Sequence, residues 1–250
     1  MPADINMFWH GPVLGPIHAA CVRSFLRHGH AVTMHCYERP ADLPDGVAVF
    51  DARKIMPLED LRPHSASGSI ALGSDRYRYR LIAEGFGTYA DCDMFCLRPI
   101  AETPYIMGAE QANTVNGAIL NYPPDSPFCE LLREATQDYN YVPPWFSESK
   151  QRKMRFFRKF GRKVSVEALG WGIWGPHLIT HLVKRLDLWT EVSNIDRFYP
   201  LHCQHAVQLK DPELCIADLT TPRTDALHLW HKISGSTAPP GSPLDEIINC

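Results

Sequence analysis

The sequence has no run of roughly 18 to 20 apolar residues, the length that a transmembrane helix needs. Residues 1–6 also lack the basic stretch and following apolar stretch that mark a secretory signal. The sequence therefore has neither the pattern of a membrane-spanning helix nor that of an export signal. We expect a cytoplasmic protein, one that could still bind at the inner face of the membrane.

Several catalytic and metal-binding signatures are also missing. There is no Gly-x-x-x-x-Gly-Lys loop, no Gly-x-Ser-x-Gly elbow and no complete dinucleotide fingerprint, which argues against P-loop NTPases, α/β-hydrolases and classical dehydrogenases. The eight cysteines include no Cys-x-x-Cys pair, and without an export signal we expect reduced thiols, mostly in the core. His177 and His181 lie four apart but lack the Glu of His-Glu-x-x-His, so no zinc site is expected there.

The composition is that of a globular protein, but its charge is unevenly distributed. The net charge of −3 gives no overall attraction for polyanions. Residues 150–163 nevertheless hold eight of the 25 basic residues and no acid, so the other 236 residues, with 17 basic and 28 acidic side chains, carry −11. Basic residues mixed with phenylalanines favour contact with an anionic membrane surface. A solvated basic loop remains an alternative, and nothing elsewhere supports nucleic-acid binding.

Strand-like and helix-like segments alternate over the first 110 residues, which predicts an α/β fold with a mostly parallel sheet flanked by helices. Apolar runs predict strands at residues 5–9, 31–37, 47–50, 94–97, 105–109 and 118–122. Apolar periodicity and capping residues predict helices at 17–29, 74–85 (capped by Ser74), 128–137 and 176–186. We expect one domain, residues 1–250, with a basic insertion at about 145–165 and a Ser/Gly/Pro-rich surface arm at about 234–250.

A pair of carboxylates follows one of these apolar runs. Asp91 and Asp93 are two residues apart, so in an extended segment they project to the same side. Such oxygen ligands suit Mg²⁺ or Mn²⁺, and ligands in open α/β sheets bind beyond the carboxyl ends of strands. Asp75 and Arg78 share one face of the preceding helix. The alternative is a simple turn in which each aspartate accepts backbone N–H bonds.

The blocks around this pair resemble the family 32 glycosyltransferases, which are sugar transferases with an Asp-x-Asp motif, including capsular polysaccharide and α-1,4-glycosyl transferases. The central blocks are Ser74-Asp75-x-x-Arg78-Tyr79, Gly87-Thr88-Tyr89-Ala90-Asp91-Cys92-Asp93 and Cys96-Leu97-Arg98-Pro99. Further similar blocks, in the same order as in the family, are Phe8-Trp9-His10-Gly11, Asn116-Gly117-Ala118-Ile119, Gly172-x-x-Gly175-Pro176 and Ala226-Leu227-His228-Leu229-Trp230. The sequence departs from the usual pattern at Phe86, where a second glycine is common, and at Ala90.

The resemblance implies a GT-A-like fold and a metal-dependent, retaining transfer of sugar from a nucleoside diphosphate donor, with UDP-sugars favoured. It implies Asp91, Asp93 and His228 as ligands of Mn²⁺ (or Mg²⁺). It also implies that five residues bind the donor: Trp9, Asp75, Arg78, Asp91 and Asn116. Among them, Trp9 would stack on the base, Asp75 would contact sugar hydroxyls and Arg78 would contact the diphosphate. Trp9 could equally be a core residue, and His228 a histidine that binds no metal.

The sequence indicates no catalytic nucleophile; Glu110 and Asp211 are only guesses. The acceptor would be a glycan or lipid-linked hydroxyl. Two other functions fit the same carboxylates. One is a metal-dependent phosphohydrolase, and the other is a non-catalytic nucleotide-sugar-binding protein or membrane adaptor. The sequence leaves the donor sugar, nucleobase, linkage and oligomeric state open.

Overall fold

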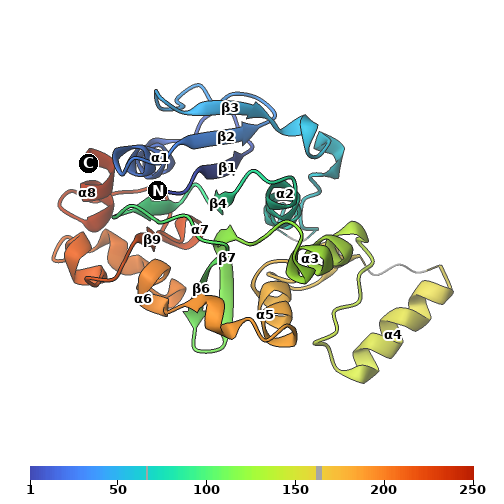
Figure 1. Ribbon diagram of the computed structural model, residues 1–250. Coiled ribbons are helices and arrows are strands. Elements are labelled where there is room, and N and C mark those ends of the chain that lie inside the picture. Colours follow the sequence, from blue (N-terminus) through green and yellow to red (C-terminus); the bar gives the residue numbers. More distant parts are fainter. Residues whose placement is uncertain (66, 162–164) are drawn as a thin grey trace.

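The computed structural model describes residues 1–65, 67–161 and 165–250, and its centre is a seven-stranded sheet with helices on both faces (Figure 1). The strand order is β3-β2-β1-β4-β7-β6-β8, and a separate pair joins β5 to β9. The strands are β1 Ile5–Trp9, β2 Val32–Cys36, β3 Ala48–Asp51, β4 Thr88–Ala90, β5 Met94–Cys96, β6 Ile106–Gln111, β7 Thr114–Asn121, β8 Val192–Ser193 and β9 Ala226–His228.

Helices lie in half of the connections between successive strands. The α-helices are α1 Pro16–Arg27, α2 Ala71–Ala83, α3 Pro127–Gln137, α4 Glu148–Lys159, α5 Pro176–Arg185, α6 Ile195–Phe198, α7 His231–Ser234 and α8 Pro243–Asn249. Short 3₁₀ helices are η1 Ala52–Lys54, η2 Leu58–Asp60, η3 Val166–Ala168, η4 Trp189–Glu191, η5 Cys203–Lys210 and η6 Ile216–Leu219.

Four of the six pairings in the large sheet are parallel, and β7 runs antiparallel to both of its neighbours. The prediction of an α/β fold, with a mostly parallel sheet flanked by helices, is therefore confirmed. Most predicted elements lie within a few residues of their observed bounds, although β7 begins four residues earlier than expected. No helix among the described residues is long and apolar enough to cross a membrane.

Strand β1 shows why the sheet is covered on both sides. Successive side chains of a strand point to opposite faces. Ile5 and Met7 belong to the core between the sheet and α1, whereas Phe8 belongs to the core beneath α2, α3 and α5. A strand buried on both faces needs apolar residues at nearly every position, which explains the continuous run that predicted it.

His35 of β2 is a buried polar residue whose ring is hydrogen-bonded to side chains of β1 and α2. His35 Nε2 lies 3.0 Å from Asn6 Oδ1, and His35 Nδ1 lies 3.0 Å from the Tyr77 hydroxyl. Because the amide oxygen can only accept, Nε2 carries the proton and Nδ1 accepts from the tyrosine. Burial lowers the pKa of His35 to about 4, so the imidazole is neutral at pH 7 and ties β1 and β2 to α2.

Helix α2 begins one turn before the predicted position. Ser74 was expected as its cap, but Ile70 is the residue before the helix, and the Ser74 N–H donates to the Ile70 carbonyl at 2.9 Å. Leu72 is buried, and a Cβ added to Gly73 would lie 2.7 Å from Leu61 Cδ1. Close packing of this turn on Leu61 therefore extends the helix, a contact that the local sequence does not encode.

The prediction of a surface arm at 234–250 is wrong from residue 243 onward. Residues 243–249 form α8, in which Ser242 accepts a hydrogen bond from the Asp245 N–H at 3.3 Å, and α8 packs against α1. Leu244 and Ile247 are fully buried. They lie three residues apart and so share a helix face. That short apolar stripe outweighs the Ser/Gly/Pro composition that suggested an arm.

The cysteines lie as expected. All eight are free thiols, and five of them are buried.

Candidate functional site

The Asp91-Cys92-Asp93 segment is a tight turn between β4 and β5. The Asp91 N–H donates to the Ala118 carbonyl of β7 at 2.7 Å, and the Met94 N–H returns to the Asp91 carbonyl at 3.0 Å. Strand β4 pairs with β1, from which the chain continues to β2 and β3 on the opposite side. The turn thus lies at the carboxyl edge of the sheet where the strand order reverses, the usual ligand position in open α/β sheets.

A histidine from the far end of the chain completes a group of possible metal ligands. Strand β9 pairs antiparallel with β5 so that His228 faces Met94, next to the aspartate turn. Each of Asp91, Asp93 and His228 offers one ligand atom, and the three atoms lie within 4.8 Å of one another. His228 Nε2 is 3.3 Å from Asp93 Oδ1.

Aromatic rings and backbone bonds fix the orientation of this group. The His228 ring lies 4.0 Å from the Trp230 ring and 5.7 Å from the Tyr199 ring, centre to centre. The Trp230 indole N–H donates to the Leu201 carbonyl at 2.8 Å. Asp93 Oδ2 accepts from the His231 N–H at 3.1 Å. Among the described residues His228 Nδ1 is buried without a hydrogen-bond partner, which is costly unless a ligand or solvent molecule meets it.

The Arg78 guanidinium forms ion pairs with two carboxylates, those of Asp91 and Asp75. It is 3.1 Å from Asp91 Oδ1 and 3.4 Å from Asp75 Oδ1, and it donates to the Gly117 carbonyl. The Tyr89 hydroxyl donates to the same Asp91 oxygen at 2.7 Å. With only 7% of its side chain exposed, Arg78 mainly contacts protein atoms and holds Asp91 in place. Its predicted contact with a diphosphate stays a prediction.

The two aspartates of the turn differ in their affinity for protons. Burial, partly offset by Arg78 and reinforced by Asp93, raises the pKa of the Asp91 carboxyl. Burial also acts to raise the pKa of Asp93, but His228, the His231 N–H and His18 outweigh it and hold that pKa well below its usual value. Asp93 is therefore ionised throughout the physiological pH range, as a direct ligand of a divalent cation must be.

Asp75 lies on α2 against the start of α5, where a Cβ on Gly175 would sit 3.1 Å from its carboxylate. Burial, opposed by Arg78 and reinforced by Asp91, raises its pKa to about 7 from the ordinary 3.8. An acid whose pKa is higher in the folded state stabilises the fold below pH 3.8, and that contribution is lost as pH rises through about 7.

We therefore expect Asp75→Asn to raise the Tm of the metal-free protein more at pH 8 than at pH 5. The asparagine keeps the shape but removes a buried charge that exists only at the higher pH. Thermal unfolding in EDTA at the two pH values measures the difference. Asp45→Asn, at an exposed aspartate, is the control and should show no such trend. Equal shifts at both pH values would contradict the raised pKa.

Trp9 and Asn116 lie on either side of the aspartate turn. Trp9 ends β1, its ring is 4.7 Å from the His18 ring, and its indole N–H donates to the Val13 carbonyl at 3.1 Å. Asn116 in β7 accepts from the Ala118 N–H at 2.8 Å, and the carbonyl of the same Ala118 accepts from the Asp91 N–H. Both residues border the site, and base stacking by Trp9 stays a prediction.

Two histidines of the site were not predicted. His18 of α1 and His231 of α7 have ring centres 4.3 Å apart, and both act on Asp93 as described above. His18 follows β1 at the start of the next helix, so the rule that ligands bind beyond strand ends could have identified it. His231 directly follows the His-x-Trp block, but no spacing linked it to Asp93.

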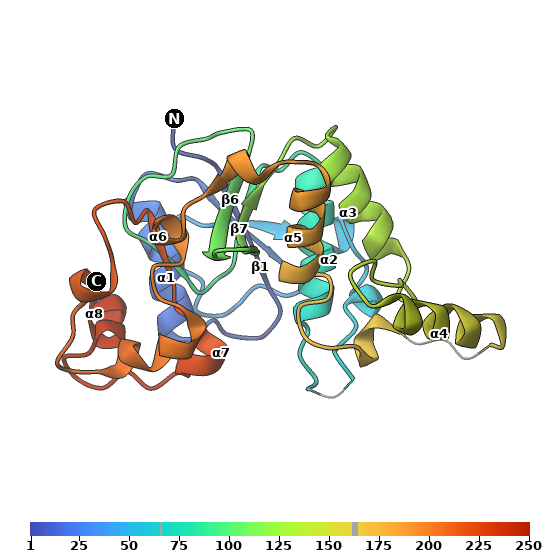
Figure 2. The same cartoon turned by 90° about the horizontal axis from the view of Figure 1, so that it is seen from below.

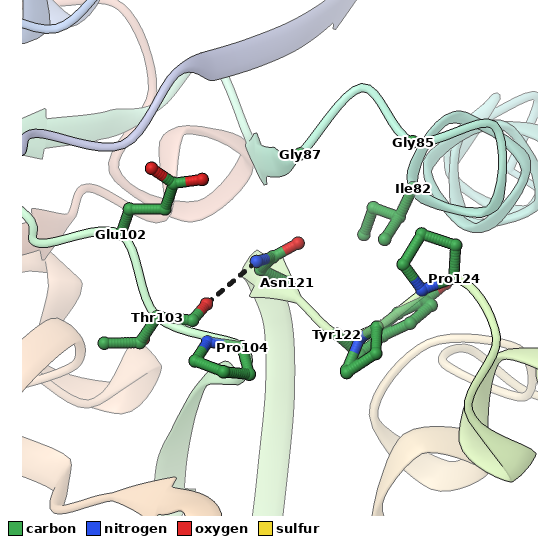
Figure 3. Close-up of a pocket in the computed structure, with 10 residues that line it drawn as sticks. Ile82, Gly85, Gly87, Glu102, Thr103, Pro104, Asn121, Tyr122 and Pro124 are labelled. Atoms are coloured by element: carbon green, nitrogen blue, oxygen red, sulfur yellow. Dashed lines mark hydrogen bonds between the residues drawn. The ribbon is translucent and has the colours of Figure 1, made fainter.

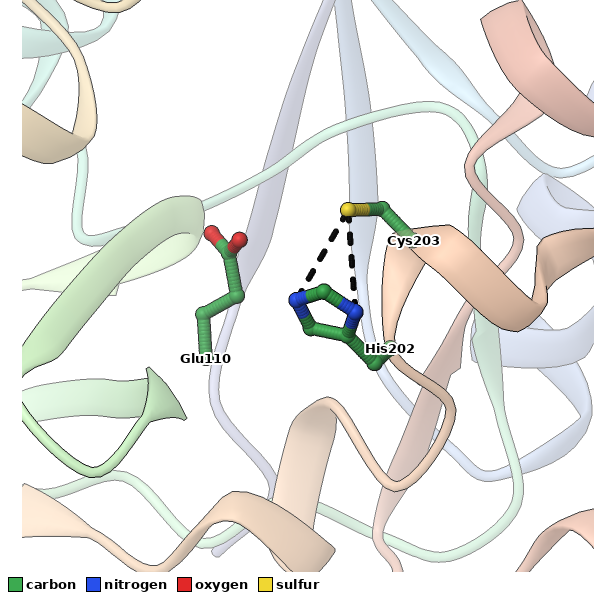
Figure 4. A group of neighbouring side chains, drawn as sticks. All are labelled: Glu110, His202 and Cys203. Atoms are coloured by element: carbon green, nitrogen blue, oxygen red, sulfur yellow. Dashed lines mark hydrogen bonds between the residues drawn. The ribbon is translucent and has the colours of Figure 1, made fainter.

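Glu110, His202 and Cys203 form a second group, with ligand atoms within 4.8 Å (Figure 4). His202 Nδ1 accepts from the Gln204 N–H at 3.3 Å, and its Nε2 lies 2.8 Å from the Gln111 amide. Both ring nitrogens are therefore already engaged, which disfavours metal binding here. Glu110 instead accepts from Asn116 at 2.7 Å and contributes to a raised pKa of His228. It borders the carboxylate site, whereas Asp211, the other guess for a nucleophile, is exposed after η5.

A cavity of about 380 Å³ opens at the other edge of the sheet (Figure 3). It lies between the turn before β4, which contains Gly87, and the end of β7 at Asn121, whose amide donates to the Thr103 carbonyl at 3.0 Å. Its walls are mainly apolar and include Ile82, Tyr122 and three prolines. Because Asp91 follows the opposite end of β4, we do not assign the donor to this cavity.

No protein-family model matches the chain, and no curated protein matches it. Among solved structures, one described as "PaToxG Glycosyltransferase" is similar, with 13% sequence identity and a TM-score of 0.47. The match covers 74% of this chain and 70% of that chain. The function proposed next is therefore based on the site of this chain.

Proposed function

We propose that the protein is a metal-dependent glycosyltransferase related to family 32, which moves a sugar from a nucleoside diphosphate donor to a hydroxyl of a glycan or lipid-linked acceptor. One observation carries the proposal. Asp91, Asp93 and His228 come from two distant segments, and their ligand atoms lie within 4.8 Å at the ligand-binding edge of the sheet. The sequence blocks that resemble family 32 supply these same residues.

The donor set suits a divalent cation that carries phosphates. Two carboxylates and one imidazole favour Mn²⁺ over Mg²⁺, because Mg²⁺ prefers oxygen ligands alone. The ionised Asp93 and the position of His228 Nε2, 3.3 Å from Asp93 Oδ1, fit this assignment. When bound, such a cation would stabilise the negative charge that grows on the leaving diphosphate.

The residues of the site would have separate roles in binding the cation and the donor. Asp93 and His228 would hold the cation directly, and Asp91 would share it or contact the ribose. Arg78 and Tyr89 hold the Asp91 carboxylate so that little reorganisation is needed when the donor binds. Trp9 would stack on the base, with UDP-sugars favoured, and Asp75 and Asn116 would contact the sugar. Retention of anomeric configuration follows from the family resemblance.

A panel of nucleotide-sugars tests the proposal. We expect transfer, or slow donor hydrolysis, that releases a nucleoside diphosphate with Mn²⁺ and stops when EDTA is added. Release of inorganic phosphate would instead indicate a phosphohydrolase. Donor binding without turnover on any acceptor would indicate a nucleotide-sugar-binding protein.

A further inference from the structure

Helix α4 projects from the rest of the molecule in both views (Figures 1 and 2). One face attaches it to the preceding loop. Arg158 pairs with Asp138 at 2.8 Å, and the Gln151 amide donates to the Phe146 carbonyl at 2.7 Å. Met154 is the buried residue of the helix. Since successive helix residues are about 100° apart, the side opposite Met154 faces away from this attachment.

That side combines cations with exposed aromatic rings, and we call it the outer face of α4: Arg152, Lys153, Arg155, Phe156 and Lys159, with Phe160 just beyond the helix. Phe156 is 57% exposed and Phe160 is 70% exposed, and their ring centres lie 4.7 Å apart. Apart from this mutual contact, more than half of each side chain remains exposed to water, so a partner surface could still bury it.

Most cations of the outer face are not neutralised within the described part of the chain. Arg152 pairs with Glu148 at 2.7 Å, whereas Lys153, Arg155 and Lys159 make no ion pair with a described acid. Arg162 and Lys163, which extend the basic segment, lie outside the described residues. The remainder of the chain carries −11, so an anionic surface would attract α4 and repel the rest.

We propose that the outer face of α4 docks the protein on an anionic lipid bilayer. The three unpaired cations would lie among the headgroups, and Phe156 and Phe160 would insert at the boundary with the acyl chains. A membrane accounts for the phenylalanines as well as the cations. Nucleic-acid binding would account mainly for the cations. The negative charge of the rest of the protein would also oppose the wrapping of a nucleic acid around it. The proposal does not depend on sugar transfer, because docking needs neither donor nor acceptor.

Sedimentation of the full chain with vesicles tests this docking. We expect binding to vesicles of phosphatidylglycerol and phosphatidylcholine at low salt, weaker binding at 0.5 M salt as charges are screened, and little binding to phosphatidylcholine alone. Lys153→Gln with Arg155→Gln and Lys159→Gln should weaken binding about 100-fold, since each cation near the surface contributes roughly a factor of five. Phe156→Ser with Phe160→Ser should remove the part that resists salt.

The matched control removes three exposed cations elsewhere: Arg27→Gln, Arg39→Gln and Lys54→Gln. It lowers the net charge by the same amount and should retain at least a third of wild-type binding. Circular dichroism and Tm check that each variant is folded. If one triple variant does not fold, the double variant Phe156→Ser with Phe160→Ser still tests whether the outer face of α4 binds the vesicles. The proposal is overturned if the wild type ignores anionic vesicles, if control and α4 variants lose binding equally, or if α4 binds RNA and not vesicles.

Discussion

Asp93→Asn is expected to lower metal-dependent release of nucleoside diphosphate by about 10³-fold, because a Lewis acid contributes several kcal/mol and each 1.36 kcal/mol is tenfold in rate. The asparagine keeps the size of the side chain and can still accept from the His231 N–H. It loses the charge that His228 faces at 3.3 Å and that the cation would need. Turnover with the best donor of the panel, measured over a range of Mn²⁺ concentrations, quantifies the loss.

Two measurements separate loss of metal from loss of fold. The variant should keep a circular dichroism spectrum like that of the wild type, while its Tm should no longer rise when Mn²⁺ and nucleoside diphosphate are added. Asp45→Asn, which alters an exposed aspartate, should behave as wild type in both assays. A wild-type rate for Asp93→Asn in the presence of EDTA would disprove the metal mechanism and leave the fold assignment untouched.

Arg78→Gln should produce the largest loss of stability, about 3 to 5 kcal/mol at pH 8, since removing one partner leaves buried carboxylates uncompensated. Asp75 and Asp91 would both lose their cation, and the Gly117 carbonyl would lose a donor. Arg78 opposes the raised pKa of Asp75, so without it Asp75 takes up a proton more readily. The loss of stability should therefore be smaller at pH 5.5 than at pH 8.

Urea unfolding at the two pH values measures this effect, and the same helix offers a control. Arg80 is partly exposed and approaches Asp60 at 3.7 Å, so Arg80→Gln should cost no more than about 1 kcal/mol. Asp75→Asn added to Arg78→Gln should recover part of the loss, because one buried charge disappears with the cation that paired it. If Arg78→Gln costs no more than Arg80→Gln, the buried cluster does not hold the site together.

The aspartate turn was the most predictable part of the site because its cause is local. An apolar run that ends in Asp91 places the carboxylates at a strand end, and a spacing of two places them on one side. The sequence predicted that Arg78 lies within reach of the aspartate pair as a donor-binding residue, but it did not predict a salt bridge from Arg78 to Asp91. The salt bridge depends on how α2 packs against β4 and β7.

The sequence by itself determined the α/β class, the approximate positions of six strands and four helices, and the carboxylate pair, because periodicity and strand-end chemistry act over a few residues. The resemblance also indicated that His228 meets these carboxylates, but only the tertiary structure shows how it reaches them and that His18 and His231 join them. The β5–β9 pairing brings His228 opposite Met94, and the turn after it places the His231 N–H on Asp93. Packing also started α2 at Ala71 and buried α8 against α1. Such contacts depend on the free energy of burying surfaces far apart in the chain, which no local pattern records.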